Sequence, residues 1–477
     1  MRDYLNFYVN GAWTPSSGQA SGDATLDVID PSTERPFARI AVGAQADVDA
    51  AVAAARRAFP AFAASTVADR MLLLGRIIEA YKARLGDLAE AVRLEMGAPA
   101  RLAGNAQAPA GLAHLATAQA LLDRFPFVED HDGYSIRREP IGVVAMVTPW
   151  NWPLNQIACK VAPAIAAGCT MVLKPSEIAP VSAMIFAEIM DAAGTPPGVF
   201  NLVNGDGPTV GAALARHPDV DMVSFTGSTR AGVEVAIGAA PTVKRVAQEL
   251  GGKSPNILLD DVDFARAVPA AVHRCMNNSG QSCNAPTRLL VPRARAADVA
   301  DIAAATANSI VVGPPSDDGV GIGPVVSERQ WTRIQELIES GMRESARLAA
   351  GGPGRPQGLN AGYYVRPTVF ADVNNEMTIA REEIFGPVLV IIPYTDDNDA
   401  IRIANDTPYG LSAYVSGGDA DRVEKIVAGV RAGQVHVNGG GTSFEAPFGG
   451  YKASGNGREW GVHGMSEFLE TKAVIAA

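Results

Sequence analysis

The chain has 477 residues, of which 47% are hydrophobic and 19% are charged, a composition typical of a soluble globular protein with two or three domains. Its formal net charge is −11 and its lysines and arginines form no cluster, which argues against binding to nucleic acid or to an anionic membrane surface. We therefore expect neither nucleic acid nor a membrane among its partners.

Cysteine usage and the apolar stretches point to a reducing, cytoplasmic setting. The 4 cysteines show no CxxC spacing, so neither a zinc site nor a disulfide framework is indicated, and we expect no metal. The N-terminal residues lack the apolar segment of a secretory signal. The longest apolar run, residues 161–173, is interrupted by Pro163 and Gly168 and is too short to span a bilayer.

The N-terminal quarter of the chain predicts a β-rich start followed by helices. Residues 1–40 are short alternating segments broken by turn residues, which favours β-ribbons rather than strands of a core sheet. Residues 46–64 are alanine-rich with helical spacing. Thr66 and Asp69 resemble a capping box that opens a second amphipathic helix, and two more scaffold helices are expected up to about Phe125.

From residue 141 the pattern changes to apolar strands that alternate with helices. We expect strands at 141–147, 170–173, 199–203, 221–225 and 243–248, with helices at 154–167, 181–193, about 208–216 and from 229. Such alternation predicts βαβ units and a parallel sheet. The expected fold class is α/β, with a doubly wound, nucleotide-binding layout.

A second alternating series begins near Gly251. Strands are expected at 256–259, 288–291, 368–370 and 388–392, with helices around 264–276, 296–310 and 328–344. This predicts a second α/β domain, with Cys283 in the loop after its first helix. Residues 133–138 resemble an exposed strand that pairs with another subunit, and the tail, residues 467–475, is expected to add a further exposed strand.

Cys283 is the first candidate catalytic residue. It lies in residues 278–284, among small and amide side chains and just after Gly280. A reactive thiolate needs access and polar hydrogen-bond donors, which a cysteine packed among Leu and Val would lack. A lone cysteine is more often a small buried residue, but the polar neighbours of Cys283 favour the reactive interpretation.

Two polar stretches follow strands of the first series and have the character of a nucleotide site. Residues 226–232 form a strand-to-helix turn with Gly227 and Ser228, where free N–H groups favour a phosphate, although a plain tight turn fits equally because the GxGxxG pattern is absent. Lys174 and Glu177 end another strand and have the spacing to hold ribose hydroxyls. A solvated ion pair is the alternative.

Two other strand ends carry side chains that can take part in catalysis. Residues 148–153 hold two tryptophans, two prolines and Asn151, whose amide can stabilise an oxyanion; packing anchors are the alternative role for the tryptophans. Glu249 precedes two glycines and can act as a general base on water, unless it forms a structural ion pair with Lys253 or Lys244.

Taken together, these motifs resemble those of the aldehyde dehydrogenase superfamily, and the resemblance runs essentially end to end. In chain order they lie at residues 149–151, 174–177, 225–229, 249–253, 280–283, 382–387 and 447–450. Each is modest evidence alone, but seven in the same order are highly specific.

The resemblance implies three structural parts. Residues 1–122 and 141–250 would form the NAD-binding domain, and residues 251–452 the catalytic domain. Residues 123–140 and 453–477 would form an oligomerisation ribbon and C-terminal tail. The expected assembly is a homodimer or homotetramer.

The resemblance also implies a function: NAD-dependent oxidation of a small-molecule aldehyde to a carboxylic acid. Cys283 would attack the aldehyde to give a thiohemiacetal, whose oxyanion Asn151 would hold, and hydride loss would leave a thioester. Glu249 would activate the water that hydrolyses this thioester.

For the cofactor, the resemblance implies ribose contacts from Lys174 and Glu177, a pyrophosphate contact from Ser228 beside Gly227, and nicotinamide-side contacts from Glu383 and Phe385. The remaining cofactor wall would be formed by Thr148, Trp150, Gly207 and Leu250. Glu177 favours NAD, because its charge would face the extra phosphate of NADP, although NADP stays possible.

The substrate side departs from the best-known patterns. By resemblance the aldehyde tunnel would be lined by Trp152, Gln156, Cys159, Ser282, Asn284 and Phe448. Succinate-semialdehyde-like members often have Arg, and betaine-aldehyde members often Trp, where Cys159 stands. We therefore expect an uncharged, fairly small aliphatic or aromatic aldehyde, with Glu445 as a feature that would instead favour a polar or cationic group.

Three rival functions stay open on the sequence. A CoA-acylating aldehyde dehydrogenase would usually lack the carboxylate of Glu249. A catalytically silent structural or binding relative would not need its intact set of catalytic side chains. A cofactor-free cysteine hydrolase would need a paired imidazole, and His273 is the only histidine near Cys283 in sequence.

Overall fold

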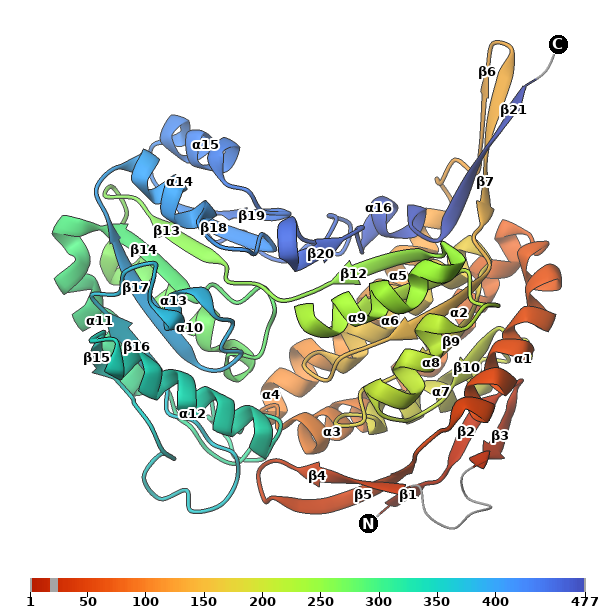
Figure 1. Cartoon of the computed structure of the whole chain (residues 1–477), viewed down its shortest axis with the longest axis horizontal. Coiled ribbons are helices and arrows are strands. Elements are labelled where there is room, and N and C mark those ends of the chain that lie inside the picture. Colours follow the sequence, from red (N-terminus) through yellow and green to blue (C-terminus); the bar gives the residue numbers. More distant parts are fainter. Residues whose placement is uncertain (1, 18–24, 476–477) are drawn as a thin grey trace.

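The computed structural model describes residues 2–17 and 25–475, and two large sheets dominate it (Figure 1). The first is eight-stranded, in the order β20-β12-β11-β8-β9-β10-β2-β3. Its strands are β2 (Asn6–Val9), β3 (Ala12–Pro15), β8 (Val143–Val147), β9 (Thr170–Lys174), β10 (Phe200–Leu202), β11 (Met222–Thr226), β12 (Arg245–Glu249) and β20 (Gly455–Asn456). The five central strands are parallel, as predicted.

The first sheet is buried on both faces, which explains its continuous apolar strands. On β8, Val144 and Met146 pack into one core and Val143 and Ala145 into another. The first core involves α2 (Val67–Ala83), α3 (Leu85–Met96), α5 (Ala108–Leu122), α6 (Pro153–Ala167) and α7 (Val181–Ala192), and the second α1 (Gln45–Ala63), α8 (Ala212–Arg216) and α9 (Thr229–Ala239). This confirms the doubly wound layout.

The first forty residues differ in part from the prediction of ribbons alone. β1 (Arg2–Tyr4), β4 (Thr25–Asp30) and β5 (Arg35–Ala41) do form a separate three-stranded sheet. β2 and β3, however, extend the eight-stranded sheet, because β2 pairs antiparallel with β10. Phe7 and Tyr8, both on β2, are at most 2% exposed, so this hairpin belongs to a core sheet after all.

The second sheet has seven strands in the order β15-β16-β17-β14-β13-β18-β19. They are β13 (Pro255–Leu258), β14 (Arg288–Pro292), β15 (Arg347–Ala350), β16 (Thr368–Ala371), β17 (Val388–Tyr394), β18 (Ser412–Ser416) and β19 (Gln434–Val437). Sequence analysis missed β15, β18 and β19. One face is covered by α10 (Phe264–Met276) and α11 (Ala296–Ser309), the other by α12 (Glu328–Arg343), α13 (Thr378–Arg381), α14 (Asp397–Asn405) and α15 (Ala420–Gly429).

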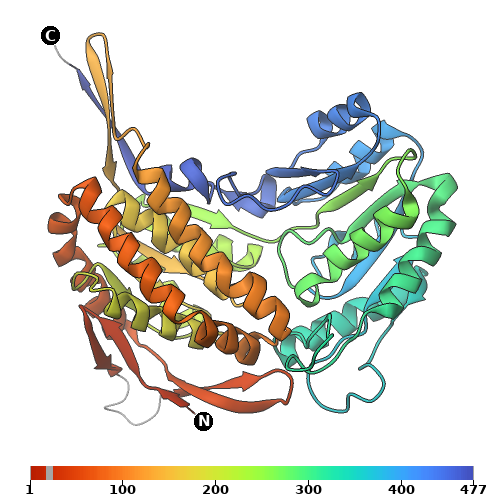
Figure 2. The ribbon, with the colours of Figure 1, turned by 180° about the vertical axis from the view of Figure 1, so that it is seen from behind.

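A third sheet, β21-β7-β6, projects from the body as a long ribbon (Figures 1 and 2). It consists of β6 (Val128–His131), β7 (Tyr134–Pro140) and β21 (Leu469–Ile475), and the two exposed strands predicted at 133–138 and 467–475 are thus antiparallel neighbours. Further short elements include α4 (Ala100–Leu102), α16 (Gly461–Ser466) and the π-helices η2 (Ala103–Gln107) and η3 (Gly207–Gly211).

The predicted capping box at Thr66 is present. The Asp69 N–H donates to Thr66 Oγ1 at 3.1 Å, and the Thr66 N–H donates to the Asp69 carboxylate at 3.0 Å. Within the described ranges, no helix is both long enough and apolar enough to cross a membrane.

Candidate active site

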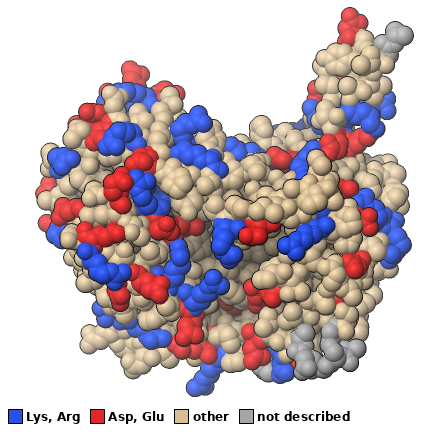
Figure 3. All heavy atoms as spheres, viewed as in Figure 1, with Lys and Arg blue, Asp and Glu red and all other residues tan. Residues whose placement is uncertain are grey.

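A cavity of about 1040 Å³ lies between the two large sheets. Figure 3 shows the hollow near the middle of the molecule, with basic and acidic side chains around its opening. One wall comes from the carboxyl ends of β8, β9, β11 and β12, and the other from α12 and residues near Glu383. We call this cavity the central cleft.

The central cleft opens where the strand order of the first sheet reverses. From β8 the chain proceeds to β9 and β10 on one side and then to β11 and β12 on the other. Such a switch point leaves a crevice at the carboxyl ends of the two flanking strands, where ligands bind in open α/β sheets. Thr148, Trp150 and Asn151 follow β8, and Gly227 and Ser228 follow β11, so the predicted residues line this crevice.

The loop that carries Cys283 is held in an unusual conformation after α10. Asn278, Ser279 and Gly280 have φ values of 55°, 56° and 72°. A Cβ on Gly280 would lie 2.0 Å from the Gly386 carbonyl oxygen, so only glycine fits there. Asn278 donates to the carbonyl oxygens of Asn151 at 2.9 Å and Gln281 at 3.1 Å, which ties this loop to the segment after β8.

Cys283 lines the central cleft, whereas the other three cysteines are at most 2% exposed. Burial raises the pKa of its thiol well above the usual range, and the Glu383 and Glu249 carboxylates raise it further. The backbone N–H of Asn284 bonds the sulfur and lowers the pKa. The thiol is therefore protonated at rest near neutral pH.

The Asn151 side chain is 4% exposed and faces the same cleft. Its amide nitrogen donates to the Gln281 carbonyl oxygen at 3.1 Å, two residues before Cys283 in the chain. The carbonyl oxygen of Asn151 accepts from Gln107 and Asn278 at 3.0 and 2.9 Å. A buried amide donor is thus fixed beside the loop that carries Cys283.

Glu249 ends β12 and is 3% exposed. Neither of its carboxylate oxygens has a hydrogen-bond partner among the described residues. Burial raises its pKa well above the ordinary value, Glu459 raises it further, and Lys160 lowers it. The alternative of a structural ion pair with Lys253 or Lys244 receives no support, because no such contact exists within the described ranges.

Lys160 and Glu459 form a buried ion pair that sequence analysis missed. Lys160 contacts the Glu459 carboxylate and donates to Thr226 Oγ1 at 2.7 Å, while the Cys159 thiol donates to Glu459 at 3.3 Å. Lys160 is the only charged residue of α6, and this was a usable signal. Glu459 offered none, because it lies 299 residues away in the chain.

The two glycines after Glu249 form a close turn between the candidate residues. The Gly252 N–H donates to the Glu383 carboxylate at 2.8 Å. A Cβ on Gly251 would lie 2.4 Å from Glu383, and one on Gly252 would lie 2.4 Å from the Cys283 carbonyl oxygen. A larger side chain at Gly251 would therefore displace Glu383, and one at Gly252 would displace the backbone of Cys283.

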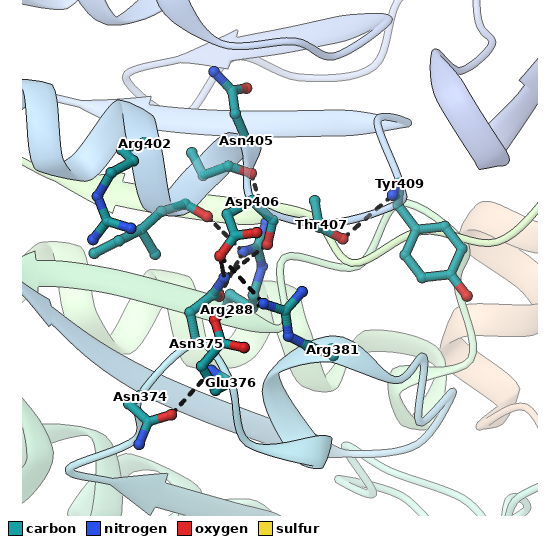
Figure 4. A network of polar contacts seen from close by, with 12 residues as sticks. Arg288, Asn374, Asn375, Glu376, Arg381, Arg402, Asn405, Asp406, Thr407 and Tyr409 are labelled. Carbon is teal, nitrogen blue, oxygen red and sulfur yellow. Dashed lines mark hydrogen bonds and ion pairs between the residues drawn. The ribbon is translucent and has the colours of Figure 1, made fainter.

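Arg288 fixes the far end of this turn through a buried polar network (Figure 4). Its guanidinium, which is completely buried, donates to the carbonyl oxygens of Lys253 at 2.9 Å, Ile403 at 2.9 Å and Ala404 at 2.8 Å, and to Asn375 Oδ1 at 3.0 Å. Arg288 therefore links residues 249–253 to the chain that leads to Tyr409, another lining residue of the cleft.

Lys174 and Glu177 lie at the end of β9. The Lys174 ammonium donates to Glu177 at 3.1 Å and to the Pro175 carbonyl oxygen at 2.8 Å. Burial lowers the pKa of Lys174, and Glu177 raises it. Both side chains line the cleft, so this ion pair is available to a ligand rather than being only a loop cap.

The N-terminus of α9 points into the cleft. Ser228 is its N-cap and accepts from the Ala231 N–H at 3.3 Å. A Cβ on Gly227 would lie 2.6 Å from the Phe225 ring, and one on Gly232 would lie 2.6 Å from Leu250. Packing therefore requires glycine at both positions, and the free N–H groups of the first helical turn favour an anionic ligand such as a phosphate.

Two aromatic rings that line the cleft meet edge to face. Trp150 and Phe385 have ring centroids 5.4 Å apart at an interplanar angle of 90°. Phe385 has a φ of 57°, and Gln330 on α12 donates to its carbonyl oxygen at 3.0 Å. Gln330 lines the cleft and was missed, since a single glutamine on an amphipathic helix gives no signal.

Several predicted residues lie outside the lining of the central cleft. Gly207 begins a short π-helix, and the six predicted substrate residues also lie elsewhere. Trp152 donates to Ser282 at 2.8 Å, Phe448 stacks on Trp460 with centroids 4.6 Å apart, and Cys159 lines a small separate cavity with Trp460. The side chain of Glu445, proposed to attract a cation, is paired with Arg124 at 3.2 Å.

The described residues contain no group of three His, Cys, Asp or Glu side chains arranged to hold a metal ion. His273 is exposed on α10.

Comparison with known proteins agrees with this geometry. Residues 18–474 match the model of the aldehyde dehydrogenase family. A 3-succinoylsemialdehyde-pyridine dehydrogenase from a Pseudomonas species is 54% identical over 100% of this chain and 99% of its own.

Two solved structures are similarly close. A mutant of aldehyde dehydrogenase C from Pseudomonas syringae, in complex with NAD+ and octanal, has a TM-score of 0.97 at 53% identity and covers 99% of this chain and 96% of its own. An aldehyde dehydrogenase from Mycobacterium tuberculosis, complexed with NAD+, has a TM-score of 0.96 at 39% identity and covers 100% and 99%. The chain therefore belongs to the aldehyde dehydrogenase family and is an oxidoreductase.

Proposed function

We propose that this enzyme oxidises an aldehyde to a carboxylic acid with NAD as hydride acceptor, and that Cys283, Asn151 and Glu249 are its catalytic residues. The observation that carries the proposal is that a thiol, an amide donor and an unpaired buried carboxylate line one cleft at the switch point of a doubly wound sheet.

The cleft residues fit a nicotinamide dinucleotide. The α9 N-terminus at Ser228 suits a pyrophosphate, and Lys174 with Glu177 suits the adenine-side ribose. Glu383 suits the second ribose, and Trp150 with Phe385 suits a flat ring. Thr148 and Leu250 complete this wall, whereas Gly207 stays a predicted contact outside it. When bound, the nicotinamide ring supplies the hydride acceptor, and two relatives of this chain have been solved with NAD+.

Acylation would begin at Cys283. Its sulfur adds to the aldehyde carbon as the thiol proton leaves, and the resulting oxyanion accepts a hydrogen bond from the Asn151 amide. Because the carbon is now tetrahedral, collapse of the oxyanion can expel hydride and leave a thioester on Cys283. The raised pKa of the thiol makes this step faster as the pH rises.

Deacylation would depend on Glu249. Its carboxylate takes a proton from water, the water oxygen attacks the thioester carbon, and the carboxylic acid leaves as Cys283 regains its proton. Neither Glu249 oxygen has a competing partner within the described ranges, which leaves both free to accept from water. A CoA-acylating activity would not need this carboxylate, so its presence supports hydrolysis.

Glu177 supports NAD over NADP. A carboxylate at the ribose position accepts two hydroxyl hydrogen bonds but repels a 2′-phosphate. Lys174 neutralises part of this charge at 3.1 Å, so use of NADP at lower efficiency is compatible with the site.

The substrate we propose is an uncharged aliphatic or aromatic aldehyde. The predicted tunnel residues are Trp152, Gln156, Cys159, Ser282, Asn284 and Phe448, none of which is charged. Glu445, the feature that would favour a cation, is paired with Arg124. The chemistry of two relatives is consistent with this class, since one was solved with octanal and the other is named for a pyridine-bearing semialdehyde.

The division into domains and the assembly are also proposals. Residues 1–122 and 141–250 would bind NAD, 251–452 would carry Cys283, and 123–140 with 453–477 would form the ribbon and tail. Within that tail, β20 pairs with β12 and so completes the first sheet. We propose that the projecting ribbon pairs with a second copy in a homodimer or homotetramer.

All four cysteines are free, which fits a reducing compartment such as the cytoplasm.

Replacement of Cys283 tests the proposal directly. Cys283→Ala should abolish NADH formation from octanal while NAD binding, followed by calorimetry, stays near the wild-type level. Cys275→Ala is the matched control, because that cysteine is completely buried and should leave turnover largely intact. Retained turnover in Cys283→Ala would remove the thiol from the mechanism.

A further inference from the structure

Tyr414 on β18 lies directly behind the nucleophile loop. Its hydroxyl donates to the carbonyl oxygen of Asn284 at 3.0 Å, although the two residues are 130 positions apart in the chain. Tyr414 is 7% exposed and stands outside the lining of the central cleft. It therefore reaches the residue after Cys283 without contacting a cofactor or substrate in that cleft.

The ring of Tyr414 is held by two neighbouring side chains. His436, its neighbour across β18 and β19, stacks on it with centroids 4.7 Å apart and an interplanar angle of 10°. The Arg274 guanidinium lies 5.2 Å from the ring centroid. A phenol clamped in this way can aim its hydroxyl at one acceptor with little loss of side-chain entropy.

Asn284 connects this anchor to the reactive sulfur. Its N–H bonds Cys283 Sγ and lowers the pKa of the thiol, while its carbonyl oxygen accepts a hydrogen bond from Tyr414. Two bonds on successive peptide groups set the orientation of Asn284. Without the Tyr414 hydroxyl, the carbonyl group of Asn284 can rotate, and the Asn284 N–H is no longer held in the direction of the sulfur.

We infer that Tyr414 is a positioning residue, which holds Asn284 so that its N–H stabilises the thiolate of Cys283. The inference rests on the proposed role of Cys283 as the nucleophile. The charged groups that face Cys283 are Glu383 and Glu249, with Glu459 farther away, and all three disfavour the thiolate. The Asn284 N–H acts in the opposite direction and favours the thiolate.

Alkylation of Cys283 tests the inference without turnover. The full-length enzyme, free of cofactor, is treated with iodoacetamide between pH 6 and 10, and the labelled Cys283 peptide is quantified by mass spectrometry. Tyr414→Phe removes only the hydroxyl, and it should slow alkylation on the order of three- to tenfold at a given pH and move the pH curve upward. The kcat for NADH formation should fall while the KM for NAD stays unchanged.

Tyr394→Phe is the matched control. Tyr394 is 3% exposed in the same sheet, and its hydroxyl donates to the Leu258 carbonyl oxygen at 2.8 Å. Tyr394→Phe therefore removes a comparable buried hydrogen bond at a position away from Cys283. It should leave the alkylation curve unchanged. If both variants alkylate like the wild type, Tyr414 is only structural and the inference is overturned.

His436→Leu decides the case in which Tyr414→Phe does not fold. It removes the stacking ring but keeps the hydroxyl, and it should shift the curve upward by a smaller amount. An unchanged curve would overturn the inference. The outcome is separate from that of the proposed function, because alkylation needs neither NAD nor aldehyde.

Discussion

Glu383 is joined to the Gly252 backbone N–H by a hydrogen bond of 2.8 Å that bridges the two walls of the central cleft. The glycine turn carries the candidate base Glu249 at its start, and Glu383 is a proposed ribose ligand. The same bond thus fixes the proposed ribose ligand Glu383 relative to the turn that begins at the candidate base Glu249.

The affinity for NAD should depend on pH through Glu383. Burial raises its pKa from 4.5 to about 7, so the carboxylate is charged above that pH and protonated below it. A charged carboxylate accepts two ribose hydroxyls, whereas the acid accepts less well, so NAD should bind progressively more weakly as the pH falls from 8 to 6. Calorimetric titrations measure this change. Glu383→Gln should bind weakly with no slope in this range, and an equal slope in both proteins would assign the titration to another group.

Replacement of Glu249 with Gln should separate the two halves of the reaction. The first turnover should still release about one NADH per active site, because hydride transfer precedes the need for a base. The steady-state rate should fall by roughly 10²- to 10⁴-fold. Rapid mixing with absorbance detection measures both phases. Equal losses in the burst and in the steady state would contradict a role confined to deacylation.

The pH dependence of the steady state gives a second test of Glu249. The base must be ionised to act, and burial raises its pKa well above the ordinary value. Thioester hydrolysis should therefore accelerate with rising pH at pH values where an ordinary carboxyl group is already fully ionised. In Glu249→Gln this acceleration should disappear from the deacylation rate, and its persistence would indicate that hydroxide alone attacks the thioester.

Asn151→Ala should slow the burst phase by roughly 10²- to 10³-fold, the usual loss for one oxyanion donor. The amide contributes only after Cys283 has attacked, so NAD binding should change little. Asn151→Asp should be at least as damaging, because a negative side chain repels the oxyanion. A normal burst rate in Asn151→Ala would exclude the side chain from oxyanion binding.

Glu177→Gln should narrow the preference for NAD over NADP. Without the charge, the repulsion of a 2′-phosphate disappears and Lys174 is freed from its partner at 3.1 Å. The ratio of kcat/KM values for the two cofactors should shift toward NADP by about tenfold or more. Glu336→Gln, which also lines the cleft, is the control and should not alter the ratio. A ratio that stays constant in Glu177→Gln would move cofactor selection elsewhere.

The local sequence was sufficient to predict many of the strands and several residues of the central cleft. Apolar stretches predicted the strands β8, β9 and β11 to within two residues, because a strand buried on both faces has few exposed polar positions. The alternation of strands and helices predicted β12, whose sequence is more polar, to the same precision. The ends of those strands held Asn151, Lys174 and Glu249. Parallel strands bring their carboxyl ends to one edge, so the residues of one cleft wall followed from the pattern.

The tertiary structure decided everything that depends on partners distant in the chain. The pairing of β2 with β10, the Lys160–Glu459 ion pair and the bond from Tyr414 to Asn284 join segments whose own composition carries no sign of the partner. Whether a buried Glu or Tyr tunes a reaction depends on the charges and donors around it, and these are set by packing. Periodicity determines which face of an element is buried, but only the fold determines what lies against it.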